Sequence, residues 1–303
     1  MKPLFEPPSP RIASLCFMGI DTKSKIDEWK GDIAKQHTTD RSNYLAAPSA
    51  GPNVMRIYEE LIIRAAQGKS NFKALVLGST PELRDFVLKH KGQLHSIDIS
   101  LDMMHKTSKL LKEQTDQFEH MLRSDWLENP LADNYFDVVI GDGVANNIAL
   151  DKQDQFFSNI HRVLKPGGHL VLREGIINPN RKPAMLEEID KDFQEKKIHW
   201  FDLLINMYWY SDISPKCTDQ SCSQKSFIKF YDALENEFLK GRVSKKAIDA
   251  VWWFRKNLNH TIMNKFDLID LMNKYFQLHP VDQSQDYEFT KDTFLFFFGQ
   301  VKK

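Results

Sequence analysis

Short apolar runs and helical periodicity alternate along the first half of the chain. The first run, Lys73–Leu77, ends at Gly78 and is typical of a buried parallel strand. Thr80 and Pro81 then occupy the N-cap and the first turn of a predicted helix. The next run, Gln93–Ile97, predicts a second strand. Three further strands are predicted at 120–123, 135–140 and 169–173, with helical patterns between them.

This alternation predicts an α/β fold in which a doubly wound, mostly parallel sheet is connected by right-handed crossovers. Ligands of such sheets bind outside the carboxyl ends of the strands. In this sequence those ends carry one glycine and four carboxylates: Gly78, Asp98, Asp125, Asp142 and Glu174. A helix N-terminus after Gly78 and the carboxylate of Asp98 are therefore expected side by side, as in a nucleoside-cofactor site.

The pattern divides the chain into an N-terminal helical segment (1–70), a sheet-containing core (71–176), a helical, aromatic-rich cap (177–290) and a terminal strand (291–303). Helices are expected over 24–36 and 54–65 in the first segment. The terminal strand is expected to pair with 277–281 and return to the core, which gives a seven-stranded sheet. Helices in and after the cap are predicted at 183–197, 226–240, 243–258 and 265–276.

Composition narrows the class of protein. The 303 residues include 41 basic and 41 acidic side chains, so net charge does not favour nucleic acid or an anionic membrane as a partner. The three cysteines make no disulfide framework, and the pair Cys217 and Cys222 has no second pair to complete a zinc site. The apolar run Ile12–Ile20 is too short to cross a bilayer and lacks a basic flank. We therefore expect a cytoplasmic protein that binds no metal, nucleic acid or membrane.

Four stretches resemble the motifs of the class I S-adenosylmethionine-dependent methyltransferases. Leu75–Leu83 looks like the first motif of this family, and Ser96–Ser100 looks like the second. Ser124–Trp126 followed by Phe136–Ile140 is similar to the adenine-contacting turn and the fourth strand. Ile160–Gly168, which reads Ile-His-Arg-Val-Leu-Lys-Pro-Gly-Gly, is the most specific piece. The resemblance implies a Rossmann-like sheet and a methyl-transfer activity.

The first motif departs from the usual pattern of the family. Val76 stands where the family has an acid, and Thr80, Pro81 and Glu82 replace the later glycines of the turn. Some members of the superfamily carry an L-G-x-T-P-E-L turn of this kind. We therefore interpret the stretch as a variant of the first motif.

The resemblance also implies which residues bind the methionine and ribose parts of S-adenosylmethionine. Backbone N–H groups of Ser79 and Thr80, just after Gly78, would approach the methionine carboxylate at the positive end of a helix. Asp98, with Ile99 beside it, would accept hydrogen bonds from both ribose hydroxyls. A tight turn without a ligand and a plain helix cap at Asp98 are the alternative interpretations.

Two further pairs complete the implied cofactor site. Asp125 would accept a hydrogen bond from the adenine amino group while Trp126 offers the base a flat face. Asp142 and Gly143 would lie near the sulfonium, which a carboxylate stabilises electrostatically. For Asp125, an ordinary surface turn is the alternative.

The acceptor of the methyl group is expected to be a small or medium organic molecule, with O- and N-methylation both open and no catalytic base identified. Arg173 and Glu174 lie where an acceptor would be positioned, although an ordinary ion pair between them is an alternative. Tyr208 and Tyr210 are candidate acceptor contacts, because Met207–Tyr210 is too rich in aromatic residues to be buried on one helical face.

Two other functions compete with methyl transfer. A dinucleotide-dependent oxidoreductase would need G-x-G-x-x-G in the first turn, which the sequence after Gly78 lacks. A non-catalytic module with this fold, whose altered first turn no longer binds a cofactor, is the second alternative. The sequence does not predict the oligomeric state.

Overall fold

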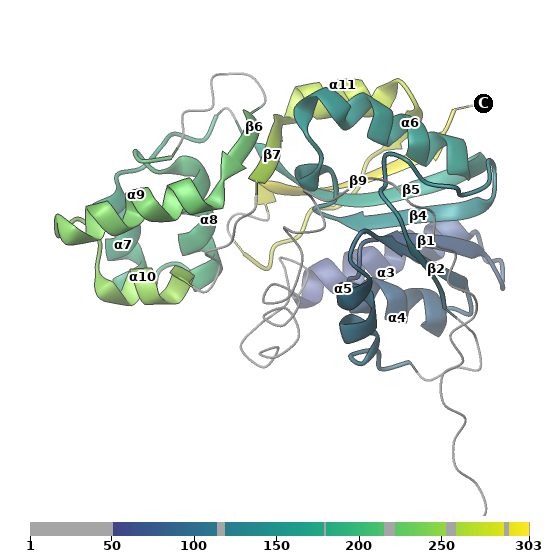
Figure 1. The fold of residues 1–303 in the computed structure, drawn as a ribbon, viewed down its shortest axis with the longest axis horizontal. Coiled ribbons are helices and arrows are strands. Elements are labelled where there is room, and N and C mark those ends of the chain that lie inside the picture. Colours follow the sequence, from purple (N-terminus) through teal and green to yellow (C-terminus); the bar gives the residue numbers. More distant parts are fainter. Residues whose placement is uncertain are drawn as a thin grey trace, which may run out of the picture.

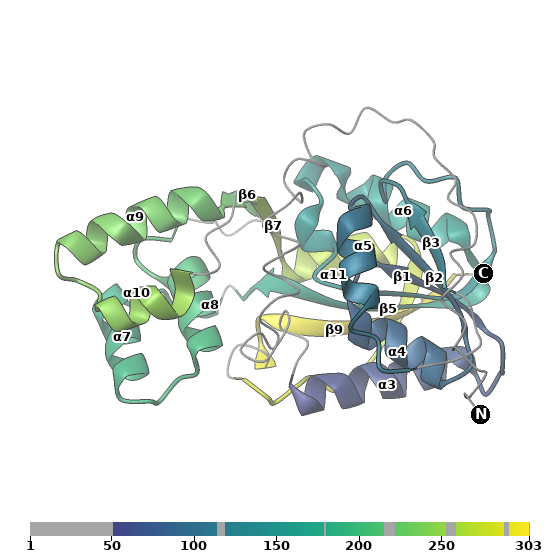
Figure 2. The same ribbon diagram turned by 60° about the horizontal axis from the view of Figure 1, so that its bottom comes forward.

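The structure is a computed structural model, and it describes residues 51–113, 119–178, 180–214, 222–252, 259–287 and 291–302. A long sheet flanked by helices forms one part, and a helical lobe projects from one end of it (Figures 1 and 2). The strands are β1 Lys73–Leu77, β2 Gln93–Asp98, β3 His120–Arg123, β4 Phe136–Asp142, β5 Leu164–Ile177, β6 Cys222–Ser226, β7 Asn259–Asn264, β8 Phe276–His279 and β9 Phe294–Val301. The helices are α3 Pro52–Ala66, α4 Pro81–Lys89, α5 Leu101–Ser108, α6 Gln153–Val163, α7 Leu186–Gln194, α8 Trp200–Tyr210, α9 Phe227–Leu239, α10 Lys245–Trp252 and α11 Lys265–Asn273.

The sheet confirms the predicted doubly wound topology. Strands β3, β2, β1, β4 and β5 lie side by side in that order and run parallel. Strand β9 then pairs antiparallel with β5, and β8 pairs antiparallel with β9, which confirms the closing hairpin. These are the seven expected strands, and two further strands, β6 and β7, extend the sheet to nine among the described residues. The carboxyl ends of β1, β2 and β4 therefore meet at one edge, where the strand order reverses.

Helices cover both faces of this sheet because its strands are apolar on both sides. One hydrophobic cluster joins α3 and α4 to one face, and another joins α6 and α11 to the other face. The amphipathic helix expected over 54–65 is confirmed as α3. The helix expected over 24–36 lies outside the described residues.

Strand β5 is longer than the sequence indicated. A break at Lys165–Gly168 was expected before a strand at His169, but β5 begins at Leu164. Phe136 of β4 pairs with Leu164, whereas Val138 pairs with His169, so an irregularity in the register absorbs the extra β5 residues. Gly167, with a φ of +76°, supplies backbone geometry that other residues rarely adopt. The Lys-Pro-Gly-Gly stretch is therefore a bulge within the strand region, not a boundary.

The projecting lobe contains α7, α8, α9 and α10 around a hydrophobic cluster of their own. Helix α8, which the sequence did not predict, packs against α7 and α10 in this lobe. Two short strands, β6 and β7, pair antiparallel and were also missed. Strand β7 joins the end of β5 through Ile176 and Met263, so the lobe is connected to the same sheet.

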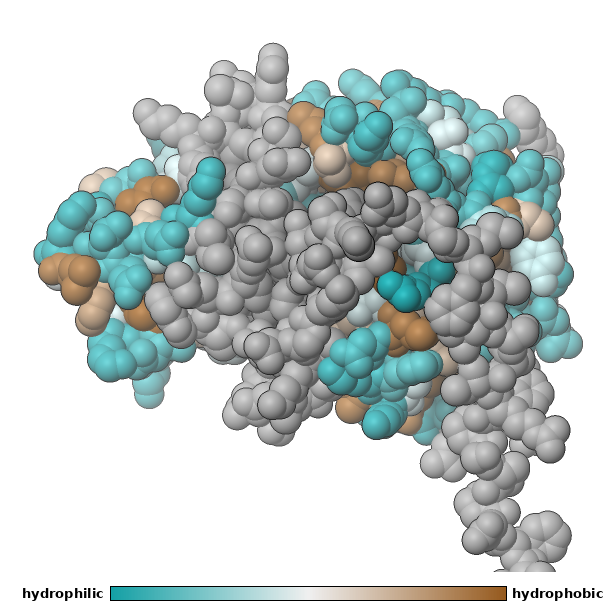
Figure 3. Space-filling model, in the orientation of Figure 1, coloured by the Kyte–Doolittle hydropathy of each residue, from teal (hydrophilic) through white to brown (hydrophobic). Residues whose placement is uncertain are grey.

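Figure 3 shows that hydrophilic residues cover much of the described surface on one face, with hydrophobic residues in small groups. Large exposed apolar side chains among the described residues include Ile63, Met185, Leu239 and Phe266. Among these residues, no helix has both the length and the apolar character needed to cross a membrane.

Candidate functional site

The turn after β1 lies against the carboxyl end of β2. Gly78 has a φ of +84°, a conformation that favours glycine, and its N–H donates to the Ile97 carbonyl at 2.8 Å. The hydroxyl of Ser79 donates to Asp98 Oδ2 at 2.7 Å. Thr80 is the N-cap residue of α4, as expected. The structure therefore brings the predicted first turn and Asp98 together.

Asp98 is a half-buried carboxylate with two protein donors. Its Oδ1 accepts the backbone N–H of Ser100 at 2.8 Å, and its Oδ2 accepts the Ser79 hydroxyl. Burial raises the pKa of Asp98, and these two hydrogen bonds and the Arg84 guanidinium partly oppose that rise. Ile99 follows at the strand end, where its carbonyl accepts from Arg123 Nε at 3.3 Å.

Trp126 also belongs to this group of residues. Its indole N–H donates to the Ile97 carbonyl at 2.9 Å. A Cβ atom placed on Gly78 would lie 3.7 Å from Trp126 Cζ2 and 4.0 Å from Asp98 Oδ2. The glycine thus faces both side chains. Asp125 instead accepts the backbone N–H of Leu127 at 2.9 Å, the geometry of a local turn.

A buried ion pair joins the ends of β4 and β5. Arg173 Nε and a terminal guanidinium nitrogen donate to the two oxygens of Asp142 at 2.9 and 3.0 Å, and these side chains are only 0% and 2% exposed. The pairing of Arg173 with Glu174 that we considered is wrong, because successive residues of a strand point to opposite faces. The hydroxyl of Tyr58 donates to the Gly141 carbonyl at 3.0 Å beside this pair. Burial raises the pKa of Tyr58 well above its ordinary value.

Glu174 holds the loop that follows β4. Its Oε2 accepts the backbone N–H of Ala145 at 3.1 Å, while within the described residues Oε1 has no hydrogen-bond partner. The side chain is fully buried, and burial raises the pKa of Glu174 to about 8, with a further rise from the negative charge of Asp142. Gly143 starts the loop with a φ of +64° and donates to the Arg173 carbonyl at 2.7 Å.

Tyr208 and Tyr210 are buried in the lobe, at 1% and 5% exposure. The expectation that Met207–Tyr210 could not all be buried is wrong, since most of α8 is apolar and all four of these residues pack into the cluster of the lobe. The hydroxyl of Tyr210 accepts the Asn178 N–H at 3.2 Å and lies 3.2 Å from the Thr293 hydroxyl. The structure does not bring these tyrosines to Asp98.

Tyr58 is a buried polar residue that the sequence did not assign to the site, and Glu174 is one whose contacts the sequence did not predict. Tyr58 followed the apolar stripe of a helix, so its position predicted a core residue. Its hydroxyl was the available signal, because a buried hydroxyl needs a polar partner. Glu174 was expected at a strand end, near the acceptor, with an ion pair to Arg173 as the alternative. Side chains alternate between the two faces of a strand, and this was the signal that Arg173 and Glu174 could not pair.

The comparisons with known proteins agree with this geometry. A protein family described as "Methyltransferase domain" matches residues 77–172. A demethylmenaquinone methyltransferase of Bacteroides fragilis is 39% identical over 93 residues, which are 30% of this chain and 36% of that protein. The chain therefore spans about a third of the length of the curated relatives it matches.

Two solved structures share the fold over most of the chain. A putative Zn-dependent alcohol dehydrogenase from Rhodobacter sphaeroides is 14% identical, with a TM-score of 0.55 over 93% of this chain and 100% of that one. The 1,6-didemethyltoxoflavin-N1-methyltransferase of Burkholderia thailandensis, solved with 1,6-didemethyltoxoflavin and S-adenosylhomocysteine, is 10% identical, with a TM-score of 0.51 over 96% of this chain and 94% of that one. Sequence identities this low show that the fold is shared and nothing more.

Within the described residues, no group of three or more His, Cys, Asp or Glu side chains could hold a metal ion.

The similarity to an alcohol dehydrogenase does not indicate a dehydrogenase, because the turn after Gly78 lacks the glycine pattern of a dinucleotide site. The matched family is also one of methyltransferases. The matched segment begins at the last residue of β1 and ends within β5, so it contains the Gly78 turn, Asp98 and Asp142. Residues 77–172 therefore match a methyltransferase domain, and they lie in a doubly wound sheet of the kind that the solved structures share.

Proposed function

We propose that the protein transfers a methyl group from S-adenosylmethionine to a small or medium organic acceptor. The observation that carries this proposal is the position of the Asp98 carboxylate, which faces the Gly78 turn at the point where the strand order reverses. A carboxylate in that position suits a ligand with neighbouring hydroxyl groups.

The residues around this turn fit an adenosyl cofactor. Gly78 leaves open the space that a Cβ would fill between Asp98 and Trp126. Asp98 would accept the ribose hydroxyls, and backbone N–H groups of Ser79 and Thr80 would meet the methionine carboxylate. Trp126 would pack beside the base, and Asp125 would have to leave its local turn to reach it.

The cofactor supplies an electrophilic methyl group on a good leaving group, so the residues of the chain have mainly to align the acceptor and exclude water. Asp142 is neutralised by Arg173, so we propose that this pair orders the strand ends and does not present a free negative charge to the sulfonium. Gly143 and the loop after it lie next to the pair, and this loop is where we place the acceptor.

The nature of the acceptor is supported by the relatives. The Burkholderia methyltransferase was solved with 1,6-didemethyltoxoflavin bound, and the Bacteroides protein is named a demethylmenaquinone methyltransferase. We propose an organic acceptor of this general size in the cytoplasm. Since Tyr210 bonds to Asn178 and lies near Thr293, we assign it to the joint between lobe and sheet, and Tyr208 to the lobe core.

A non-catalytic module is the second candidate, and one observation favours it. The Ser79 hydroxyl already donates to Asp98 Oδ2, one of the two oxygens that would receive the ribose. If this hydrogen bond persists in solution, the carboxylate has one oxygen fewer for a ligand. The lobe would then act as a partner surface.

Calorimetric titration of the whole chain with S-adenosylmethionine, S-adenosylhomocysteine and NAD separates these functions. We expect both adenosyl compounds to bind and NAD not to bind. Asp98→Ala should abolish binding, because it removes the acceptor of the ribose hydroxyls. Asp102→Ala, an exposed acid in the next helix that pairs with Lys106, is the matched control and should bind normally. Unchanged affinity in Asp98→Ala would contradict the proposed site, and binding of none of the three compounds would support the module.

A further inference from the structure

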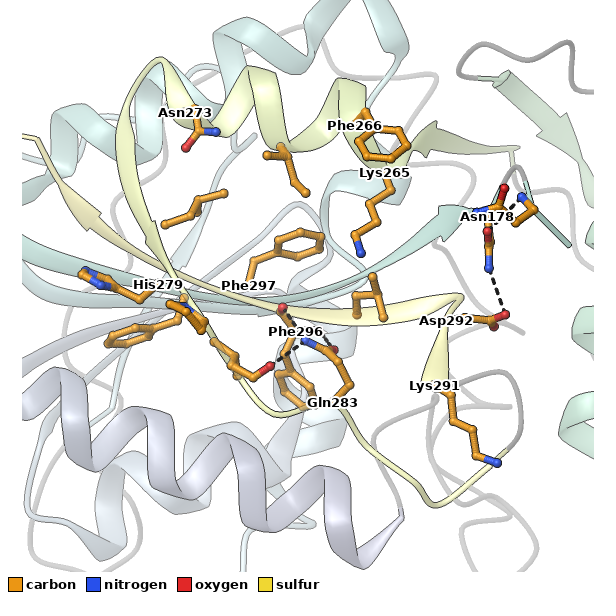
Figure 4. A pocket seen from close by; sticks show the side chains of 17 residues that line it. Asn178, Lys265, Phe266, Asn273, His279, Gln283, Lys291, Asp292, Phe296 and Phe297 are labelled. Carbon is orange, nitrogen blue, oxygen red and sulfur yellow. Dashed lines mark hydrogen bonds between the residues drawn. The ribbon is translucent and has the colours of Figure 1, made fainter.

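A pocket of about 620 Å³ lies along the outer edge of β9 (Figure 4). It exists because β8 is shorter than β9. Strand β8 pairs only with Phe298–Val301, so the first half of β9, which pairs with β5 on its inner edge, has no strand on its outer edge. The side-chain amide of Gln283 takes the place of a strand there, since it accepts the Phe296 N–H at 2.7 Å and donates to the Phe296 carbonyl at 3.2 Å.

The floor of the pocket is apolar. Phe297 and Leu295 point from β9 toward α11, and Ile269 and Leu278 line the same space. Phe266, at the start of α11, is 62% exposed at its rim. The exposed aromatic ring and the apolar floor together offer a surface that a hydrophobic ligand could cover.

The charge at one end of the pocket is positive. Lys265 extends from α11 toward Phe297 in Figure 4, and within the described residues it makes no hydrogen bond or ion pair. The acidic residue in the lining, Asp292, is already engaged by Arg181 at 3.1 Å and by Asn178 at 3.0 Å. Lys291 also lines the pocket and has an interaction of its own. The lining therefore attracts an anion.

We propose that this pocket binds an amphiphilic carboxylate, with its apolar body on Phe297, Leu278 and Ile269 and its carboxylate beside Lys265. The volume lies within the roughly 300–1,000 Å³ range of small-ligand sites and is too small for a folded partner. A ligand with an apolar part and one anionic end would match both the apolar floor and Lys265.

This site is separate from the methyltransferase site. None of its lining residues belongs to the Gly78 turn, the end of β2 or the loop after β4. Binding of a ligand to the pocket beside β9 can therefore be measured without S-adenosylmethionine. If no ligand binds there, the proposed methyl transfer is unaffected.

The test is calorimetric titration of the full chain with decanoate below its micelle concentration, compared with decanol and decyltrimethylammonium. We expect decanoate to bind at one site per chain and the cationic compound not to bind there. Lys265→Ala should weaken decanoate by about three- to fivefold, the size of a partly exposed charge contact, and leave decanol unchanged. Lys265→Arg should restore most of the affinity.

Lys274→Ala is the matched control, because this lysine follows the other end of α11 and pairs with Asp154 instead. It should leave decanoate binding unchanged. Ile269→Trp should block the compounds by filling the floor, with circular dichroism as the check on folding. Equal loss in the Lys265 and Lys274 variants, equal affinity for decanoate and decyltrimethylammonium, or no binding of decanoate would each overturn the proposal.

Discussion

Buried charge is concentrated at the carboxyl ends of β4 and β5. Asp142 of β4 and Arg173 of β5 neutralise each other there. Glu174 follows Arg173 in β5, points to the opposite face of the sheet and has only backbone N–H groups around it. Burial raises the pKa of Glu174 and so holds this side chain in its neutral form.

The first prediction concerns the pH dependence of stability. The folded state raises the pKa of Glu174 from its ordinary value of 4.5 to about 8, so between these values only the folded chain keeps the proton. Stability should therefore fall as pH rises from about 5 to 8, by about 2–4 kcal/mol from this group, and level off above pH 8. The glutamine of Glu174→Gln cannot titrate, so the free energy of unfolding of this variant, measured with urea, should not show this dependence on pH. Glu235→Gln, at an exposed position, should retain the wild-type slope.

The second prediction concerns the ion pair. Arg173→Met should destabilise the protein by about 3–5 kcal/mol in urea unfolding, because it leaves the Asp142 charge buried without a partner. Adding Asp142→Leu to this variant should recover much of the loss. A loss no larger than that of Lys274→Ala, which removes an exposed pair, would show that the buried pair is not needed for stability.

At the scale of single elements, the sequence predicted the helices and strands of the sheet better than their ends, and it missed α8, β6 and β7. Helix α3 was confirmed, but its first turn is held by Asp286, which accepts the N–H groups of Asn53 and Val54 at 3.1 and 2.7 Å. This acid lies more than two hundred positions away in the sequence, so local reading of residues 50–54 could not find it. Strand β5 was predicted too short for a related reason, since only pairing with β4 shows that residues 165–168 continue it as a bulge.

The third prediction tests this cap. Asp286→Ala should destabilise the chain by about 1 kcal/mol, because two N–H groups at the positive end of α3 lose their acceptor. Hydrogen exchange should become faster at Asn53 and Val54 and stay unchanged in α4. Asp282→Ala, an exposed acid in the same segment, should change neither quantity. Identical behaviour of the two variants would contradict the assigned cap.

At the scale of the whole molecule, the lobe and the sheet meet at a tightly packed joint. Trp209 of α8 stacks on Phe294 of β9 with ring centroids 5.2 Å apart. Gly175 of β5 allows this contact, since a Cβ there would lie 2.3 Å from Trp209 Cη2. Arg181 adds a polar contact, with its guanidinium 4.8 Å from the centre of the Tyr210 ring.

The fourth prediction follows from that joint. Gly175→Val should force Trp209 away from Phe294 and cost about 1–3 kcal/mol, as overpacking does. Hydrogen exchange should rise in α8 and at the start of β9 while β1 and β2 keep their protection. Leu239→Ala, at a 76% exposed position in the lobe, is the control and should leave exchange unchanged. Uniform loss of protection would indicate general unfolding and contradict a local joint.

The sequence by itself determined the parallel sheet, the existence of its first five strands and the meeting of the Gly78 turn with Asp98. These features follow from periodicity and from glycine and acid residues at strand ends, which are local properties of the chain. The tertiary structure alone decided that Arg173 pairs with Asp142, that Met207–Tyr210 of α8 are all buried and that the pocket beside β9 is open. Each depends on which distant residues pack together, because a buried charge or an apolar helix is stable only with the partners that the fold brings to it.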